Sequence, residues 1–224
     1  MGEKLMDVNF HPLDLQSWSS GQMFYYFTQM APTGYSLTAQ VDVTTMRDTL
    51  KKHNIKFFPA YLWLVTKMLN RQIEFKVAMK DEMLGFWDTL TPLYATFHDD
   101  DKTISLMWTE YCESFSEFYE HYLKDKKDYG DNHGILAQPQ QMPPTNSYTV
   151  SCLPWIEFEH FAVHSYENKQ YYFPSIEAGK FIKQGNTIKM PLSITAHHAT
   201  TDGWHIKKFL DDLQNAMNNP YKWI

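Results

Sequence analysis

Two adjacent histidines, His197 and His198, are followed after three further residues by an aspartate, Asp202, and then by another histidine, His205. Histidine is the side chain whose ordinary pKa lets it accept and release a proton near neutral pH. An imidazole held against a substrate hydroxyl can therefore act as a general base. These residue types at this spacing point to proton-transfer chemistry.

Two predicted elements would hold these side chains. The run 188–196 alternates apolar and polar residues, which predicts a half-buried strand, and the run 206–217 has apolar residues at helical spacing. The histidines then lie at the end of a strand, and Asp202 lies where a helix begins. Such a junction projects side chains from a rigid frame, as a catalytic group requires.

Two other interpretations compete with catalysis. Asp202 is a favourable N-cap, because aspartate accepts hydrogen bonds from the first N–H groups of a helix and lies at the positive end of its dipole. The three histidines and Asp202 could instead bind a metal, although zinc sites usually show more regular spacing or cysteines. A histidine pair taken alone favours a structural role.

The composition is that of a globular chain. Of its 224 residues, 43% are hydrophobic and 16% aromatic, enough for a substantial core in one large domain or two small ones. The net charge of −6 and the two arginines, Arg47 and Arg71, argue against nucleic acid as a partner. Cys112 and Cys152 follow no disulfide pattern and are expected to be buried free thiols.

The sequence contains no recognisable membrane or export signal. No apolar stretch approaches about 18 residues without a charge. Residues 1–6 lack the apolar core of a secretory signal and the Ser or Thr of a myristoylation signal. We therefore expect a cytoplasmic enzyme or binding protein.

Periodicity predicts helices and strands along the whole chain. Helices are expected near 24–27 and over 44–52, 59–69, 114–126 and 206–217. Strands are expected over 35–43, 75–79, 83–87, 91–98, 103–108, 147–153, 159–165, 170–182 and 188–196, with a turn at 184–186. The helix over 59–69 is apolar around most of its circumference and should be the buried central one.

Helices and strands that do not alternate strictly predict an α+β fold. We expect a two-layer sandwich in which one mixed β-sheet is covered by helices on one face. Residues 129–146 contain glycine, asparagine, glutamine and a pair of prolines. We interpret them as a long surface loop and not as a linker, because the N-terminal half alone would lack partners for its strands. Residues 1–224 are expected to form a single domain.

The pattern His-His-x-x-x-Asp-Gly resembles the signature of the chloramphenicol acetyltransferase family, within the larger group of CoA-dependent acyltransferases. Further stretches resemble the family in the same order and at the same spacing, including a Ser-x-x-Pro-Trp motif: 34–38, 56–60, 97–98, 151–155 and 178–181. The resemblance covers nearly the whole chain, so the sequence is identified as a member. It implies a chloramphenicol acetyltransferase-like fold.

The resemblance also implies a reaction. It implies direct acetyl transfer from acetyl-CoA to a hydroxyl of chloramphenicol, an antibiotic-resistance activity, in a ternary complex without a permanently bound cofactor. His198 matches the general base and Ser151 matches the hydroxyl that stabilises the oxyanion. Asp202 is assigned an orienting role, His197 a structural one, and His205 a place in the helix. The implied assembly is a homotrimer with active sites between subunits.

Two groups of residues match binding positions of the family. Those expected at the coenzyme are Lys56, Trp155, Lys180 and Phe181. Those expected around the acceptor are Tyr26, Phe27, Thr33, Tyr35, Ile104, Leu136 and Glu177. A tryptophan is as readily a core residue, and a lysine as readily a solvated one.

The sequence departs from the family at two places. Ser20 occupies the position of an arginine that holds the motif aspartate, so Asp202 needs another partner: hydroxyls, the N–H groups of the helix start, or a lysine. In the acceptor pocket, Phe27 stands for a tyrosine of the family, Thr33 for a cysteine, and Ile104 and Leu136 each for a phenylalanine. The largest change is Glu177, which replaces a small hydroxyl residue. It could define the acceptor, rotate to solvent or pair with a lysine.

These departures leave three alternatives beside the leading hypothesis. Glu177 and Ile104 motivate the same chemistry on a different hydroxyl acceptor. The missing arginine motivates a non-catalytic trimer that binds a ligand. The histidines themselves leave metal chemistry as the remaining alternative.

Overall fold

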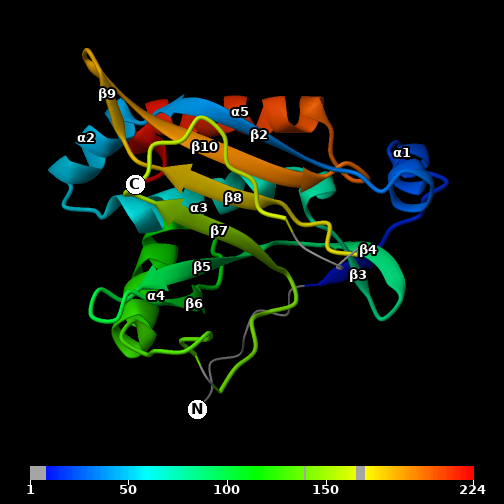
Figure 1. Cartoon of the computed structure of the whole chain (residues 1–224), viewed down its shortest axis with the longest axis horizontal. Helices are drawn as coiled ribbons and strands as arrows, with labels where there is room; N and C mark the ends of the chain where they lie inside the picture. The colour runs from blue at the N-terminus through cyan, green and yellow to red at the C-terminus, as the bar shows by residue number, and fades with distance from the viewer. Residues whose placement is uncertain (1–8, 139, 165–169) are drawn as a thin grey trace.

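A computed structural model of the chain describes residues 9–138, 140–164 and 170–224 (Figure 1). Residues 1–6, in which no export signal was recognised, lie outside the described residues. The described helices are α1 Gly21–Tyr25, α2 Thr44–Lys52, α3 Phe57–Leu69, α4 Phe115–Tyr129 and α5 Gly203–Asn218, with short π and 3-10 helices at Tyr26–Met30, Ile73–Phe75 and Pro220–Lys222. None of the described helices is both long and apolar enough to cross a membrane.

The strands confirm most of the predicted pattern. They are β1 Phe10–Pro12, β2 Gly34–Asp42, β3 Val77–Lys80, β4 Met83–Trp87, β5 Thr91–Phe97, β6 Ile104–Trp108, β7 Ser147–Leu153, β8 Ser175–Gly179, β9 Ile182–Gln184 and β10 Thr187–His197. A seven-stranded sheet has the order β2-β10-β8-β7-β5-β6, with β9 paired to β10. The pairs β5–β7 and β7–β8 are parallel and the others antiparallel, so the predicted mixed sheet is confirmed.

Helices cover one face of this sheet. Met190, Leu192 and Ile194 of β10 are fully buried in the main core, into which α3 and α5 also pack. Helix α3 is buried along most of its length, as its apolar sequence predicts. It begins at Phe57, which places Pro59 in the first turn, where a missing N–H is tolerated. The predicted helical layer is therefore confirmed.

The opposite face of the sheet is called the front face here, and it carries the side chains of Ser151, Glu177 and Ser193. After β7 the chain crosses this face over β8 and β10 (Figure 1). The Ser193 hydroxyl donates to the Phe161 carbonyl, and the Val163 N–H donates to Thr195 Oγ1 at 3.3 Å.

The strand predicted over 159–165 is therefore wrong for residues 159–164, and residue 165 lies outside the described residues. Hydroxyl side chains of the sheet hold this segment where it crosses the front face. It therefore does not pair with the edge of a strand.

Two further strand predictions need correction. The strands near 75–79 and 83–87 do not join the main sheet, because β4 pairs with both β1 and β3 in a separate three-stranded sheet. The strand predicted over 170–182 is wrong for residues 170–174, because β8 begins only at Ser175. It is also interrupted after Gly179, where the Lys180 N–H donates to the Ile156 carbonyl at 2.9 Å. Beyond this point β9 forms a hairpin with β10, and Gly185, at φ +59°, provides the predicted turn.

Candidate active site

The histidine motif occupies the predicted junction between a strand and a helix. Strand β10 ends at His197 and α5 begins at Gly203. The N–H groups of Thr200 and Thr201 both donate to the His197 carbonyl at 3.2 Å, which closes a tight turn. Because Ala199, Thr200 and Thr201 of this turn are buried between two regular elements, its side chains have defined positions.

The ring of His198 has a defined tautomer. Its Nδ1 lies 3.0 Å from the Thr201 carbonyl oxygen, which can only accept a hydrogen bond. Nδ1 therefore carries the proton, and Nε2 keeps its lone pair. The His198 backbone N–H donates to the Thr33 carbonyl at 2.9 Å, which fixes the main chain as well. Such a ring can accept a proton at Nε2.

Aromatic residues hold the His198 ring from two sides. Phe27 stacks on it with ring centroids 4.0 Å apart, and Tyr35 meets it edge-on at 5.1 Å. The Tyr35 hydroxyl donates to Thr201 Oγ1 at 3.2 Å. Tyr26 in turn packs edge-on against Phe27. The structure thus gathers four residues expected at the acceptor, including Thr33, around the expected base.

His197 makes contacts of a structural kind. Its Nδ1 accepts a hydrogen bond from the Ala199 N–H at 3.1 Å, and its ring meets Tyr172 edge-on at 5.1 Å. Burial lowers the pKa of His197, and the neighbouring His198 lowers it further. The ring is therefore neutral at working pH, and its contacts support the turn.

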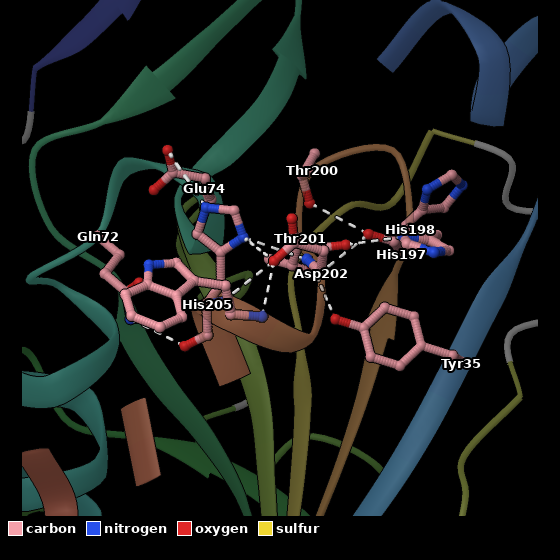
Figure 2. A network of polar contacts seen from close by, with 10 residues as sticks. Tyr35, Gln72, Glu74, His197, His198, Thr200, Thr201, Asp202 and His205 are labelled. Carbon is pink, nitrogen blue, oxygen red and sulfur yellow. Dashed lines mark hydrogen bonds and ion pairs between the residues drawn. The ribbon is translucent and has the colours of Figure 1, made fainter. Parts of the chain in front are cut away.

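Asp202 caps α5 (Figure 2). Its carboxylate accepts from the N–H groups of Trp204 at 2.8 Å and His205 at 3.3 Å, while the Asp202 N–H donates to His205 Nδ1 at 3.2 Å. Burial raises the pKa of Asp202, but the hydrogen bonds and the charge of His205 outweigh it, so the net shift is downward. The carboxylate is ionised and does not contact His198.

The partner of Asp202 replaces the arginine of the family pattern. Arg71 pairs instead with Asp212 at 3.2 Å. Of the expected partners, the N–H groups at the helix start are those observed. His205 is a second neighbour of this carboxylate, because its Nδ1 lies 2.9 Å from Asp202 Oδ1. Its Nε2 lies 3.8 Å from Glu74 Oε1.

The role of His205 was not predicted. The signal was present in the sequence, since Asp-x-x-His has the spacing of a capping box with histidine in place of glutamate or glutamine.

Ser151 lies in a different part of the sheet. It pairs with Glu177 on β8, and Glu177 pairs with Ser193 on β10. His198 lies five residues beyond Ser193, which at about 3.3 Å per residue is roughly 16 Å further along the sheet. The two strand spacings between β7 and β10 add about 10 Å across it. A single chain therefore does not bring Ser151 to His198.

The residues expected at the coenzyme lie at the end of the sheet where the parallel strands β7 and β8 finish. Trp155 packs edge-on against Phe97 at 4.9 Å and is 60% exposed, so it is not a core residue of the single chain. Phe181 packs against Phe57 at 4.9 Å. Lys56 and Lys180, next to these rings, are exposed.

Glu177 is buried on the front face and only 1% exposed. Its Oε1 accepts a short hydrogen bond from the Ser175 hydroxyl, whereas Oε2 has no partner among the described residues. Burial raises the pKa of Glu177 to about 7, and the Ser175 hydrogen bond opposes this shift. The side chain therefore does not rotate to solvent, and it pairs with none of the lysines that the structure describes.

The last two residues expected at the acceptor lie near the strand at the edge of the sheet. Ile104 begins β6, pairs with Phe97 and is 50% exposed. Leu136 is half-buried and forms a bridge to Leu106. Both lie on the Ser151 side of the sheet, away from His198.

A cavity of about 1130 Å³ opens at the end of the sheet where β10 finishes. Its lining includes Thr33, Tyr35 and His197 from the motif region, and Ser175 and Thr195 from the front face. Sheet hydroxyls and a tyrosine beside the histidines form a surface suited to a small aromatic or hydroxylated molecule.

The motif does not have the geometry of a metal site. Among the described residues, two groups place three potential ligand atoms within 4.8 Å of one another: His98 with Asp100 and His133, and Cys112 with Glu117 and His121. Neither includes a residue of the motif, so the metal alternative finds no support there.

Comparison with known proteins identifies the family. The family described as chloramphenicol acetyltransferase matches residues 8–214. The chain belongs to the chloramphenicol acetyltransferase family. A relative from Clostridium butyricum named chloramphenicol acetyltransferase is 34% identical over 218 residues, covering 97% of this chain and 99% of that protein. One of the same name from Staphylococcus aureus is also 34% identical, covering 97% and 100%.

A solved structure supports the fold assignment. A chloramphenicol acetyltransferase superposes with a TM-score of 0.77, covering 94% of this chain and 99% of that chain at 22% identity. The predicted α+β family fold is thereby confirmed, and at this identity the likeness concerns the fold alone.

The cap of α5 gives a first prediction. Asp202→Ala removes the acceptor for two N–H groups and should lower the free energy of unfolding by about 1 kcal/mol, whereas Asp202→Asn should lose much less. Asp211→Ala on the exposed face of α5 is the control. Urea denaturation measures the difference. Equal effects of the Asp202 and Asp211 alanine variants would contradict the capping role.

Glu177 gives a second prediction. Its folded pKa is raised from the ordinary 4.5 to about 7, so the folded state binds more protons than the unfolded state between these values. The free energy of unfolding should therefore fall as pH rises from 4.5 to 7, by on the order of 3 kcal/mol.

Glu177→Gln should remove this fall, whereas Glu120→Gln, on the exposed face of α4, should keep it. Denaturation at fixed protein concentration across this pH range provides the measurement. A parallel loss of stability in wild type and Glu177→Gln would show that Glu177 is not the titrating group.

Proposed function

We propose that this chain, as a single domain over residues 1–224, is an acetyl-CoA-dependent O-acetyltransferase that acetylates a hydroxyl of chloramphenicol. The observation that carries the proposal is the arrangement of His198. Its Nδ1 donates to the Thr201 carbonyl, its Nε2 keeps the lone pair, and the Phe27 ring stacks on the imidazole. Membership of the family and the names of the relatives supply the substrates.

The proposed reaction is a direct transfer. His198 Nε2 takes the proton of the acceptor hydroxyl as its oxygen attacks the thioester carbonyl. The tetrahedral intermediate then collapses, the carbon–sulfur bond breaks, and the proton passes to the leaving thiolate. A positioned base of this kind contributes roughly 10²–10⁴ in rate. Asp202 is a positioning residue here, because it holds the turn that carries Thr201 and hence His198 Nδ1.

The oxyanion requires a hydroxyl donor that a single chain does not place beside the base. We assign this donor to Ser151, whose hydroxyl has no partner in the described part of the chain. Because roughly 16 Å of strand separates it from His198 within one chain, the site needs Ser151 from a second copy. A cyclic homotrimer would supply one such interface per subunit.

The coenzyme would bind at the end where β7 and β8 finish. Trp155 and Phe181 offer apolar rings for the pantetheine arm, and Lys56 and Lys180 offer charge for its phosphates. A groove of about 300 Å³ next to Phe57 is lined by Arg47, Lys51 and Lys56. A local concentration of three cations in a chain of net charge −6 favours a polyphosphate ligand.

A different hydroxyl acceptor is the second candidate, and Glu177 is the observation that favours it. Its carboxyl lies beside Ser151 on the neighbouring strand, where the family has a small hydroxyl. A buried carboxyl with an unpartnered oxygen would favour acceptors that donate a hydrogen bond there. Chloramphenicol is nevertheless the acceptor that the family and the relatives support.

Release of coenzyme A thiol tests the proposal. Wild type should release thiol from acetyl-CoA only when chloramphenicol is added, and His198→Ala should lower kcat by about 10²–10⁴. His53→Ala, an exposed histidine after α2, should leave kcat unchanged. A folded trimer without acceptor-dependent release would refute the chloramphenicol assignment, and turnover of another hydroxyl compound would then establish the second candidate.

A further inference from the structure

A cysteine, a glutamate and a histidine converge at the start of α4, far from the histidine motif. Cys112 lies in the segment before the helix, and Glu117 and His121 lie one turn apart within it. Their ligand atoms all fall within 4.8 Å of one another. Helix α4 and the end of β10 lie at opposite ends of the molecule (Figure 1), and none of the three residues is assigned a role in the proposed acetyl transfer.

The spacing of the two softer ligand atoms matches a tetrahedral metal. Cys112 Sγ and His121 Nδ1 are 3.4 Å apart. Zinc–sulfur and zinc–nitrogen bonds of about 2.3 and 2.05 Å at a tetrahedral angle place the two atoms about 3.6 Å apart. The pair therefore needs almost no movement to bind one ion.

The proton arrangement also suits a metal. The Cys112 thiol donates to His121 Nδ1, which directs the nitrogen lone pair at sulfur. A cation bound between the two atoms would replace this one proton.

The surroundings hold the group in place. The Cys112 carbonyl accepts from Trp63 Nε1 of the central helix at 2.9 Å, which anchors the cysteine backbone. Ser114 caps α4 by accepting from the Glu117 N–H. Two helices therefore position the ligands, as a metal site requires.

The charges nearby favour a cation. Glu110 and Glu117 both act electrostatically on Cys112. Asp125, one turn beyond His121 on α4, interacts electrostatically with His121 and accepts from the Thr109 hydroxyl at 2.8 Å. Asp125 thus adds a third carboxyl group near the ligands, which favours a bound cation.

We propose that Cys112, Glu117 and His121 bind a thiophilic divalent cation of the zinc type. The ligands are Cys112 Sγ, His121 Nδ1 and a carboxylate oxygen of Glu117, with water as the fourth. Binding forms the metal–sulfur bond and releases the thiol proton to solvent. The site ties the start of α4 to the segment that anchors it on α3, so the ion stabilises the fold.

Cobalt titration of chelator-treated wild-type protein tests the proposal, because a thiolate bound to Co²⁺ gives a near-ultraviolet charge-transfer band. One equivalent should produce the band, and zinc should abolish it by displacement. Cys152→Ser is the matched control, since Cys152 is the other cysteine of the chain, and it should keep the band. Cys112→Ser should lose the band, and Asp125→Asn should weaken binding, because it removes a nearby carboxyl group.

A second measurement needs no variant at the site. Zinc should raise the melting temperature of wild type and of Cys152→Ser, and a chelator should reverse the shift. Absence of the band and of the shift in wild type would overturn the proposal. A band that persists in Cys112→Ser, or one that disappears in Cys152→Ser, would overturn it as well. Acetyl transfer is not part of either readout, so a failure here leaves the proposed function untouched.

Discussion

The antiparallel pairing of β10 with β8, beside the parallel pairing of β8 with β7, is the constraint on which the proposed active site depends. It places the end of β10 and the ends of β7 and β8 at opposite ends of one sheet. The expected base follows β10, and the expected oxyanion donor and coenzyme residues lie in or after β7 and β8. Because the hydrogen-bonded register is rigid, no local movement within a chain can join the two halves. The register thus gives a physical reason for an active site shared between copies.

Within its own half, the base is positioned mainly by main-chain groups and aromatic rings. His198 is held by the carbonyls of Thr33 and Thr201 and by the Phe27 ring. Asp202 acts on His198 indirectly, through the cap that begins α5. The absence of the arginine of the family pattern is therefore tolerable. The N–H groups at the start of α5 supply the hydrogen bonds and the positive potential that an isolated carboxylate would lack.

The sequence predicts local structure well where one period dominates. Alternation in β10 and helical spacing in α5 locate the junction that carries the motif, and the apolar α3 is recognised as central. Prediction fails where segments distant in the sequence determine which strands form and pair. Strands β3 and β4 are expected in the main sheet, but they form a separate sheet with β1, in which β4 is the central strand. The segment after β7 looks like a strand, although sheet hydroxyls hold it as an irregular crossing.

The candidate site shows the same limit. The sequence motifs identify His198, Ser151 and Asp202 as one set of site residues. The periodicity of the sequence does not show that His198 and Ser151 lie far apart within a chain. Glu177 could be recognised as a departure, whereas its burial depends on the segment that crosses the front face. The role of His205 was missed because a place in the helix already accounted for this residue. Its spacing from Asp202 nevertheless matches a capping box.

Complementation between inactive subunits tests the shared site most directly. His198→Ala and Ser151→Ala subunits, each inactive alone, are unfolded together, refolded as mixed trimers and assayed for thiol release. A site formed between two copies predicts recovery of up to about one quarter of wild-type activity in an equal mixture, since only one of four pairings supplies both groups. The His198→Ala, Ser151→Ala double variant mixed with either single variant should recover none. Mixed trimers that stay as inactive as their parents would contradict a site shared between subunits.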